Sequence, residues 1–115
     1  MKTTAMVALW LGAWASPALA ATWQCVPDSE IVCSAGACQS VQPTTRSLVD
    51  FDSSAYSRCD SKSCDRYPMV SAKSGIFVSV QFAPGTLFKA TADGSAYVEV
   101  VTLGVQTYSY FGRCQ

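Results

Sequence analysis

The fold is decided by residues 76–111, which read IFVSVQFAPGTLFKATADGSAYVEVVTLGVQTYSYF. Apolar residues alternate with other residues through much of this stretch, and a period of two is the pattern of a β-strand with one buried face. Turn signals divide the stretch at Pro84-Gly85, Asp93-Gly94 and Gly104. The sequence therefore predicts a four-stranded antiparallel meander, with strands over residues 76–82, 86–91, 96–103 and 105–111.

The alternation also assigns side chains of the meander to the faces of its strands. In the first strand the apolar face is expected to hold Ile76, Val78, Val80 and Phe82. In the third strand Ala96, Val98 and Val100 are expected on one face.

The first half of the chain is less regular. Residues 23–26 and 47–51 are expected to be strands, and residues 56–67 a hairpin, while no stretch has the 3.6-residue period of an amphipathic helix. Short strands separated by turn signals are typical of a sheet that curls on itself to cover its apolar face and its edges. We therefore expect a single all-β domain over residues 21–115, a small antiparallel barrel or sandwich stapled by disulfides.

Residues 1–20 have the features of a cleavable export signal. Lys2 is followed by an apolar run over residues 5–15, and Ala18-Leu19-Ala20 offers the small residues that a signal peptidase reads. The apolar run is short for a bilayer span, so we expect cleavage after Ala20, no membrane insertion, and a periplasmic or secreted protein.

Composition excludes several classes of partner and chemistry. The chain has eight basic and eight acidic residues and no histidine. It has no basic stripe of the kind that binding to nucleic acid requires. The missing histidine removes the usual general base of serine and cysteine nucleophile systems. We expect no cofactor and no enzymatic activity.

Six cysteines in an exported chain predict three disulfides. The turn-forming residues between Cys59 and Cys64 would place these two sulfurs opposite each other in a hairpin. Cys33 and Cys38 repeat the spacing around a glycine, and by elimination Cys25 pairs with Cys114. A metal site at the two C-x4-C pairs is the alternative, but the spacing is wider than that of zinc knuckles.

The hairpin over residues 56–67 has a predicted register. Folding it about residues 61–62 puts Arg58 opposite Asp65, as an opposite-charge pair, and Tyr56 opposite Tyr67. Arg58 and Asp65, together with Asp60 and Arg66, are interpreted as a solvated hairpin tip with weak ion pairs.

Two sets of residues are candidates for chemistry or binding. Asp50 and Asp52 would point to one face of a strand, as the carboxylate pair of a glycosidase does, although a half-solvated strand explains them as well. Tyrosine is favoured in interfaces, so the pairs Tyr108 and Tyr110, and Tyr56 and Tyr67, are expected to be exposed contact residues unless the core takes them.

The stretch Val70-Ser71-Ala72-Lys73-Ser74-Gly75-Ile76-Phe77, followed by a meander and a near-terminal cysteine, resembles the bacterial periplasmic inhibitors of C-type lysozyme. Those inhibitors are small β-barrels closed by an end-to-end disulfide, and they carry a Ser-Gly-x-x-Tyr motif whose tyrosine position is Val78 here. The resemblance implies that Ser74 enters the enzyme cleft beside Gly75, with Lys89 or Lys73 supplying a complementary charge. An ordinary Ser-Gly hairpin turn is the alternative.

The segments over residues 56–65 and 111–114 also resemble a set of short exported bacterial proteins to which no function is attached. The expected function is that of an exported, non-enzymatic binding or inhibitory module acting on another protein, with a lysozyme as the example of a target. A structural or envelope-associated role is the alternative.

Overall fold

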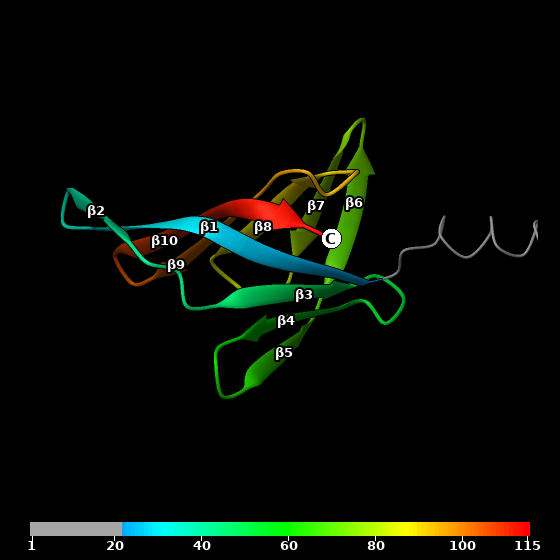
Figure 1. Ribbon diagram of the computed structural model, residues 1–115, viewed down its shortest axis with the longest axis horizontal. Coiled ribbons are helices and arrows are strands. Elements are labelled where there is room, and N and C mark those ends of the chain that lie inside the picture. The colour runs from blue at the N-terminus through cyan, green and yellow to red at the C-terminus, as the bar shows by residue number, and fades with distance from the viewer. Residues whose placement is uncertain (1–21) are drawn as a thin grey trace, which may run out of the picture.

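The computed structural model describes residues 22–115, and every regular element in that range is a β-strand (Figure 1). The strands are β1 (Thr22–Ser34), β2 (Ala37–Val41), β3 (Arg46–Asp50), β4 (Ala55–Cys59), β5 (Cys64–Pro68), β6 (Val70–Ser74), β7 (Phe77–Gln81), β8 (Thr86–Thr91), β9 (Tyr97–Leu103) and β10 (Gln106–Cys114). The expected signal segment, residues 1–20, lies outside the described residues. The described range contains no helix of the length and apolarity that crossing a bilayer needs.

Nine strands form a nearly closed antiparallel barrel in the order β5-β4-β3-β1-β10-β9-β8-β7-β6. β1, with thirteen residues, connects the two halves. One of its edges pairs with β10 from Cys25 to Ser34, while its other edge pairs first with β3 and then with β2. The all-β, disulfide-stapled fold expected from the sequence is confirmed, and the barrel is the form it takes.

Backbone pairing stops between the two end strands of the barrel, β5 and β6. The backbone N–H of Met69, which joins them, donates to the carbonyl oxygen of Ser54 at 2.9 Å. The ring of Phe82, just after β7, stacks on Tyr56 of β4 with centroids 3.8 Å apart. Aromatic packing therefore covers the seam where backbone pairing stops.

The predicted meander is present as β7 to β10, and β6 adds a fifth strand to it. The first strand begins one residue later than expected, at Phe77, because Gly75 and Ile76 form a two-residue turn between Ser74 and Phe77. Ile76 is therefore 67% exposed and does not belong to the apolar face.

The face of β9 that carries Val98 and Val100 is not the most buried face of this strand. Ala96 precedes the strand and is exposed, and the buried side chains of the strand are Tyr97 and Glu99. The buried face of β9 therefore includes a charged residue, Glu99, which a pattern of apolar residues does not reveal. Glu99 lies inside because an arginine from another strand neutralises it there.

Three disulfides join Cys25 to Cys114, Cys33 to Cys38 and Cys59 to Cys64, as the sequence predicted. The first is buried and joins the two ends of the described chain. The second braces the β1–β2 hairpin, and the third braces the β4–β5 hairpin, whose predicted register is confirmed. Three disulfides in a chain of this size are typical of proteins from oxidising, extracellular compartments.

Candidate binding surface

The β6–β7 tip, residues 74–77, is the most exposed apolar feature that carries sequence-predicted site residues. Gly75 has φ +61°, a conformation that glycine adopts without strain, so the chain reverses within two residues. Ile76 and Phe77 are 67% and 40% exposed. The backbone N–H of Ala92, in the β8–β9 loop, donates to the carbonyl oxygen of Ile76 at 2.7 Å. The tip is therefore exposed to solvent and is held by a hydrogen bond from the β8–β9 loop.

Two lysines flank the β6–β7 tip on opposite faces of the hairpin. Lys89 of β8 lies on the outer face, where its Nζ is 4.9 Å from the centroid of the Phe77 ring. Lys73 pairs with Val78, on the other face, and lines a groove with Gly75, Ile76 and residues of the β8–β9 loop. Among residues 22–115, neither lysine lies within ion-pairing distance of a carboxylate. Both positive charges are therefore presented to solvent.

The β8–β9 loop beside the tip is held by Asp93. Its carboxylate accepts hydrogen bonds from the Ser95 backbone N–H at 3.0 Å and from the Thr91 hydroxyl at 2.8 Å. These donors stabilise the charged form and lower the pKa of Asp93 to about 2. The carboxylate therefore serves to order the loop that supports the tip.

The two tyrosines predicted as exposed contact residues on β10 lie on the inner face of the barrel. Tyr110 is only 6% exposed, so the prediction that it is a surface contact is wrong. Tyr108 is half-buried, packs against the core, and donates its hydroxyl to Gln106 at 2.8 Å. Phe111, on the opposite face of β10 from these tyrosines, is 42% exposed. Strand alternation identified the two faces of β10 but not which of them is inside.

The pair Tyr56 and Tyr67 is also not an exposed pair. Tyr56 is fully buried, and Tyr67 is half-buried against Phe82 at a centroid distance of 5.6 Å. Both rings therefore belong to the seam of the barrel, where aromatic side chains replace backbone pairing.

The proposed carboxylate pair does not share a strand. β3 ends at Asp50, whose carboxylate accepts the Ser53 backbone N–H at 3.1 Å, and Asp52 lies in the turn that follows. That hydrogen bond lowers the pKa of Asp50. Asp50 therefore acts in the β3–β4 turn, and the strand arrangement expected for a glycosidase pair is absent from residues 46–55.

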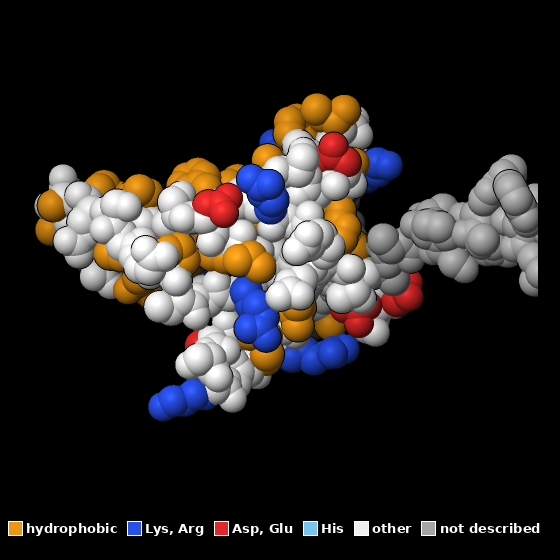
Figure 2. Space-filling model, viewed as in Figure 1, with side chains coloured by type: hydrophobic (Ala, Val, Ile, Leu, Met, Phe, Trp, Pro, Cys, Tyr) orange, Lys and Arg blue, Asp and Glu red, His pale blue; other side chains and the backbone are white. Residues whose placement is uncertain are grey.

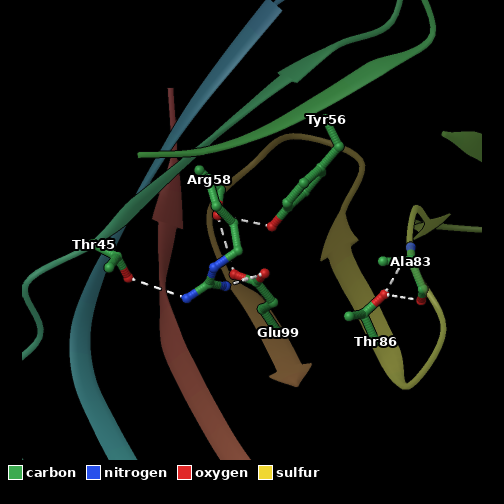
Figure 3. A network of polar contacts seen from close by, with 7 residues as sticks. Thr45, Tyr56, Arg58, Ala83, Thr86 and Glu99 are labelled. Carbon is green, nitrogen blue, oxygen red and sulfur yellow. Dashed lines mark hydrogen bonds and ion pairs between the residues drawn. The ribbon is translucent and has the colours of Figure 1, made fainter. Parts of the chain in front are cut away.

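A buried polar network that the sequence did not predict crosses the barrel (Figure 3). Arg58 of β4 forms an ion pair with Glu99 of β9, and their side chains are 18% and 2% exposed. Ser47 donates to Glu99 at 3.1 Å and accepts the Tyr56 hydroxyl at 2.8 Å. The guanidinium also lies 4.6 Å from the ring centroid of Tyr110. The expected Arg58–Asp65 charge pair is therefore wrong, although the two residues are opposite each other in the strands.

Burial and the neighbouring Glu99 carboxylate raise the pKa of Tyr56 well above its ordinary value. Every buried polar atom of the described side chains has a partner, so this network is internally satisfied. Its groups hold strands together across the barrel and present nothing to a ligand. One feature of the sequence could have indicated that Glu99 is buried. It lies two residues from Tyr97 and therefore on the same face of the strand.

The described residues contain no group of three or more metal-ligating side chains. In comparisons with models of protein families, with curated proteins and with solved structures, nothing matches this chain. The functional argument therefore depends on the chemistry of the described surface.

Proposed function

We propose that this chain is an exported, non-enzymatic binding module that inhibits another protein by inserting the β6–β7 tip into its cleft. The observation that carries the proposal is a supported hairpin tip with two exposed apolar side chains, Ile76 and Phe77, between two lysines. A preorganised tip loses little conformational entropy on binding, so its apolar contacts contribute more of their free energy to affinity.

The charges of the tip favour an acidic target cleft. Lys73 and Lys89 lie on opposite faces of the hairpin, so each would face one wall of a cleft that received the tip. Ser74, at the end of β6, carries a hydroxyl that can donate to a carboxylate. A cleft with apolar walls and paired carboxylates, as in a C-type lysozyme, fits this set of groups.

A role for the tip in catalysis is less well supported. Asp93 is the carboxylate nearest to it in the groove that Lys73 lines, and the hydrogen bonds of its own loop keep its pKa low. A general acid at neutral pH requires a raised pKa. The arrangement therefore favours recognition of a target's carboxylates over acid chemistry by the chain itself.

The experiment is turnover of a cell-wall substrate by a C-type lysozyme, measured with increasing amounts of the purified protein. We expect inhibition, with Ile76→Ser and the double variant Lys73→Glu/Lys89→Glu each weakening it at least about tenfold, as for interface hot spots. Ser74→Ala should have a smaller effect, because one neutral hydrogen bond to a charged group is lost.

The matched controls change the same residue types elsewhere. Lys62→Glu changes an exposed lysine in the β4–β5 turn, and Val105→Ser an 88% exposed apolar residue in the β9–β10 turn. Both should inhibit like the unaltered protein. If the unaltered protein leaves turnover unchanged at high micromolar concentration, the lysozyme is excluded as a target. Co-sedimentation of the same preparation with cell envelope would then favour the structural role.

A further inference from the structure

Three strands keep an edge without a partner in the part of the chain that the structure describes, namely β2, β5 and β6. An open edge presents backbone N–H and C=O groups that can pair with a strand of another chain. Proteins usually protect such edges with charged residues or with proline. The three edges differ in this protection.

β5 carries Asp65, Arg66 and Pro68, and β6 carries Lys73 on the face that points toward the barrel interior. β2 has the sequence ACQSV, which contains neither charge nor proline. Of these three edges, β2 is therefore the one that nothing in its own strand protects from pairing.

The surroundings of β2 are also uncharged. Residues 31–45 and 100–112, which include β2 and its neighbours in β1, β9 and β10, contain no Asp, Glu, Lys or Arg. In Figure 1 these strands extend to one end of the molecule, and on the face shown in Figure 2 that end shows no charged side chains. Two copies can therefore approach through this end without bringing like charges together.

β2 is held in strand geometry before any partner arrives. The Cys33–Cys38 disulfide joins it to β1, and Ala35 and Gly36, with φ of +52° and +78°, form a two-residue turn between Ser34 and Ala37. In such a hairpin the pair next to the turn is hydrogen-bonded and the pairs alternate from there. Cys38 and Ser40 therefore direct their backbone groups away from β1, toward the open edge.

We propose that a second copy of this chain pairs with β2 in antiparallel orientation, about a two-fold axis that passes beside Gln39. In this register Cys38 lies opposite Ser40 of the second copy, so the outward N–H and C=O groups of each satisfy those of the other. Gln39 faces Gln39 of the second copy, and Val41 lies next to Ala37 of the second copy. The dimer has one sheet that continues through both molecules, and its interface is isologous, as a two-fold dimer requires.

The interface is small, because β2 has five residues. Stable dimers usually bury about 800 Å² on each partner, which a single short strand does not reach. We therefore expect weak association, with dimers populated only at high protein concentration. A protein concentrated in a confined compartment would populate such a dimer.

The test is sedimentation velocity of the oxidised protein from low micromolar to millimolar concentration, with charge-swapped variants at the axis. Gln39→Lys and Gln39→Glu each place two like charges opposite each other, which is destabilising in a cross-strand pair. Each variant should weaken dimerisation at least about fivefold, and an equimolar mixture of the two should restore it. Ser40→Pro, which removes an outward N–H that β1 does not use, should also weaken dimerisation.

The matched control makes the same changes at β6, where Ala72 is the central residue of an open edge. Ala72→Lys and Ala72→Glu should dimerise like the unaltered protein. A protein that stays monomeric at millimolar concentration would overturn the proposal. Dimers that persist in Gln39→Lys, or a Lys and Glu mixture that stays monomeric, would also overturn it, and loss of dimers in Ala72→Lys would assign the contact to β6.

Discussion

The ion pair across the barrel should be a main determinant of stability, and replacing Arg58 by Met tests this. The substitution keeps an unbranched chain close to the length of the arginine's aliphatic stem, and it removes the partner of a carboxylate whose side chain is 2% exposed. Breaking a buried ion pair from one side typically costs about 3 to 5 kcal/mol. Arg58 itself is 18% exposed, so water can partly replace it, and Ser47 still donates to Glu99. We therefore expect a loss of about 3 kcal/mol in the free energy of unfolding.

The assay is equilibrium unfolding in urea with the disulfides intact, followed by the fluorescence of Trp23, whose ring packs on Phe51 at a centroid distance of 5.1 Å. For a domain of this size, about 3 kcal/mol corresponds to a shift of roughly 2 to 3 M in the urea midpoint. Arg66→Met is the control, because Arg66 is an exposed arginine on β5. It should change stability by less than about 0.5 kcal/mol.

A double variant separates the ion pair from simple packing. Arg58→Met/Glu99→Leu replaces both charges by apolar groups, and such replacements are often neutral or stabilising. It should be more stable than Arg58→Met alone by at least about 1.5 kcal/mol. The reasoning is refuted if Arg58→Met unfolds within about 0.5 kcal/mol of the unaltered protein, or if the double variant is no more stable than the single one.

Two further predictions concern pH and the disulfides. Burial raises the pKa of Tyr56, Tyr97 and Tyr110, so the stability that their neutral forms contribute is fully present below about pH 10 and is lost as the pH rises further. Absorbance at alkaline pH should therefore show that these phenols ionise together with the loss of near-UV circular dichroism. Ionisation of all phenols before the circular dichroism is lost would contradict this prediction. Replacing Cys25 and Cys114 by Ser should lower the free energy of unfolding by roughly 4 to 5 kcal/mol through loop entropy, whereas replacing Cys33 and Cys38 should lower it by about 2 kcal/mol. The difference arises because the sequence separations of the two pairs are 89 and 5. Equal losses of stability in thermal unfolding of the two variants would contradict this prediction.

Local signals account for the parts of the fold that were predicted correctly. Turns such as Asp93-Gly94 and the spacing of Cys59 and Cys64 act within a few residues, so one sequence is enough to interpret them. β1 was predicted only over residues 23–26, because Pro27 and Asp28 are poor strand residues. In the structure the register shifts between Pro27 and Ser29, and the strand continues beyond this irregularity. β6 was missed because all five of its residues are exposed and leave no alternating pattern.

The faces of β9 and β10 depended on contacts that no local pattern reports. Glu99 lies inside because Arg58, 41 residues earlier in the chain, reaches it across the barrel. Tyr110 lies inside because the same guanidinium covers its ring. A sequence shows that Tyr108 and Tyr110 share a face, but the hydroxyl of tyrosine makes either side of a strand acceptable. The exposure of the β6–β7 tip was more predictable, since Gly75 and Ile76 form a two-residue turn whose exposure follows from its geometry.

The two proposed surfaces lie on different strands, and this makes their effects separable. Pairing through β2 uses an edge that the β6–β7 tip does not share, so a dimer keeps two tips accessible to targets (Figure 1). A dimer that meets targets on a surface gains from the high effective concentration of its second tip, whereas a target in dilute solution binds each tip independently. Gln39→Lys should therefore leave inhibition of a soluble target unchanged and weaken retention on an immobilised target, measured by the dissociation rate at high surface density. Equal dissociation rates for Gln39→Lys and the unaltered protein at high surface density would show that pairing through β2 does not act together with the tip.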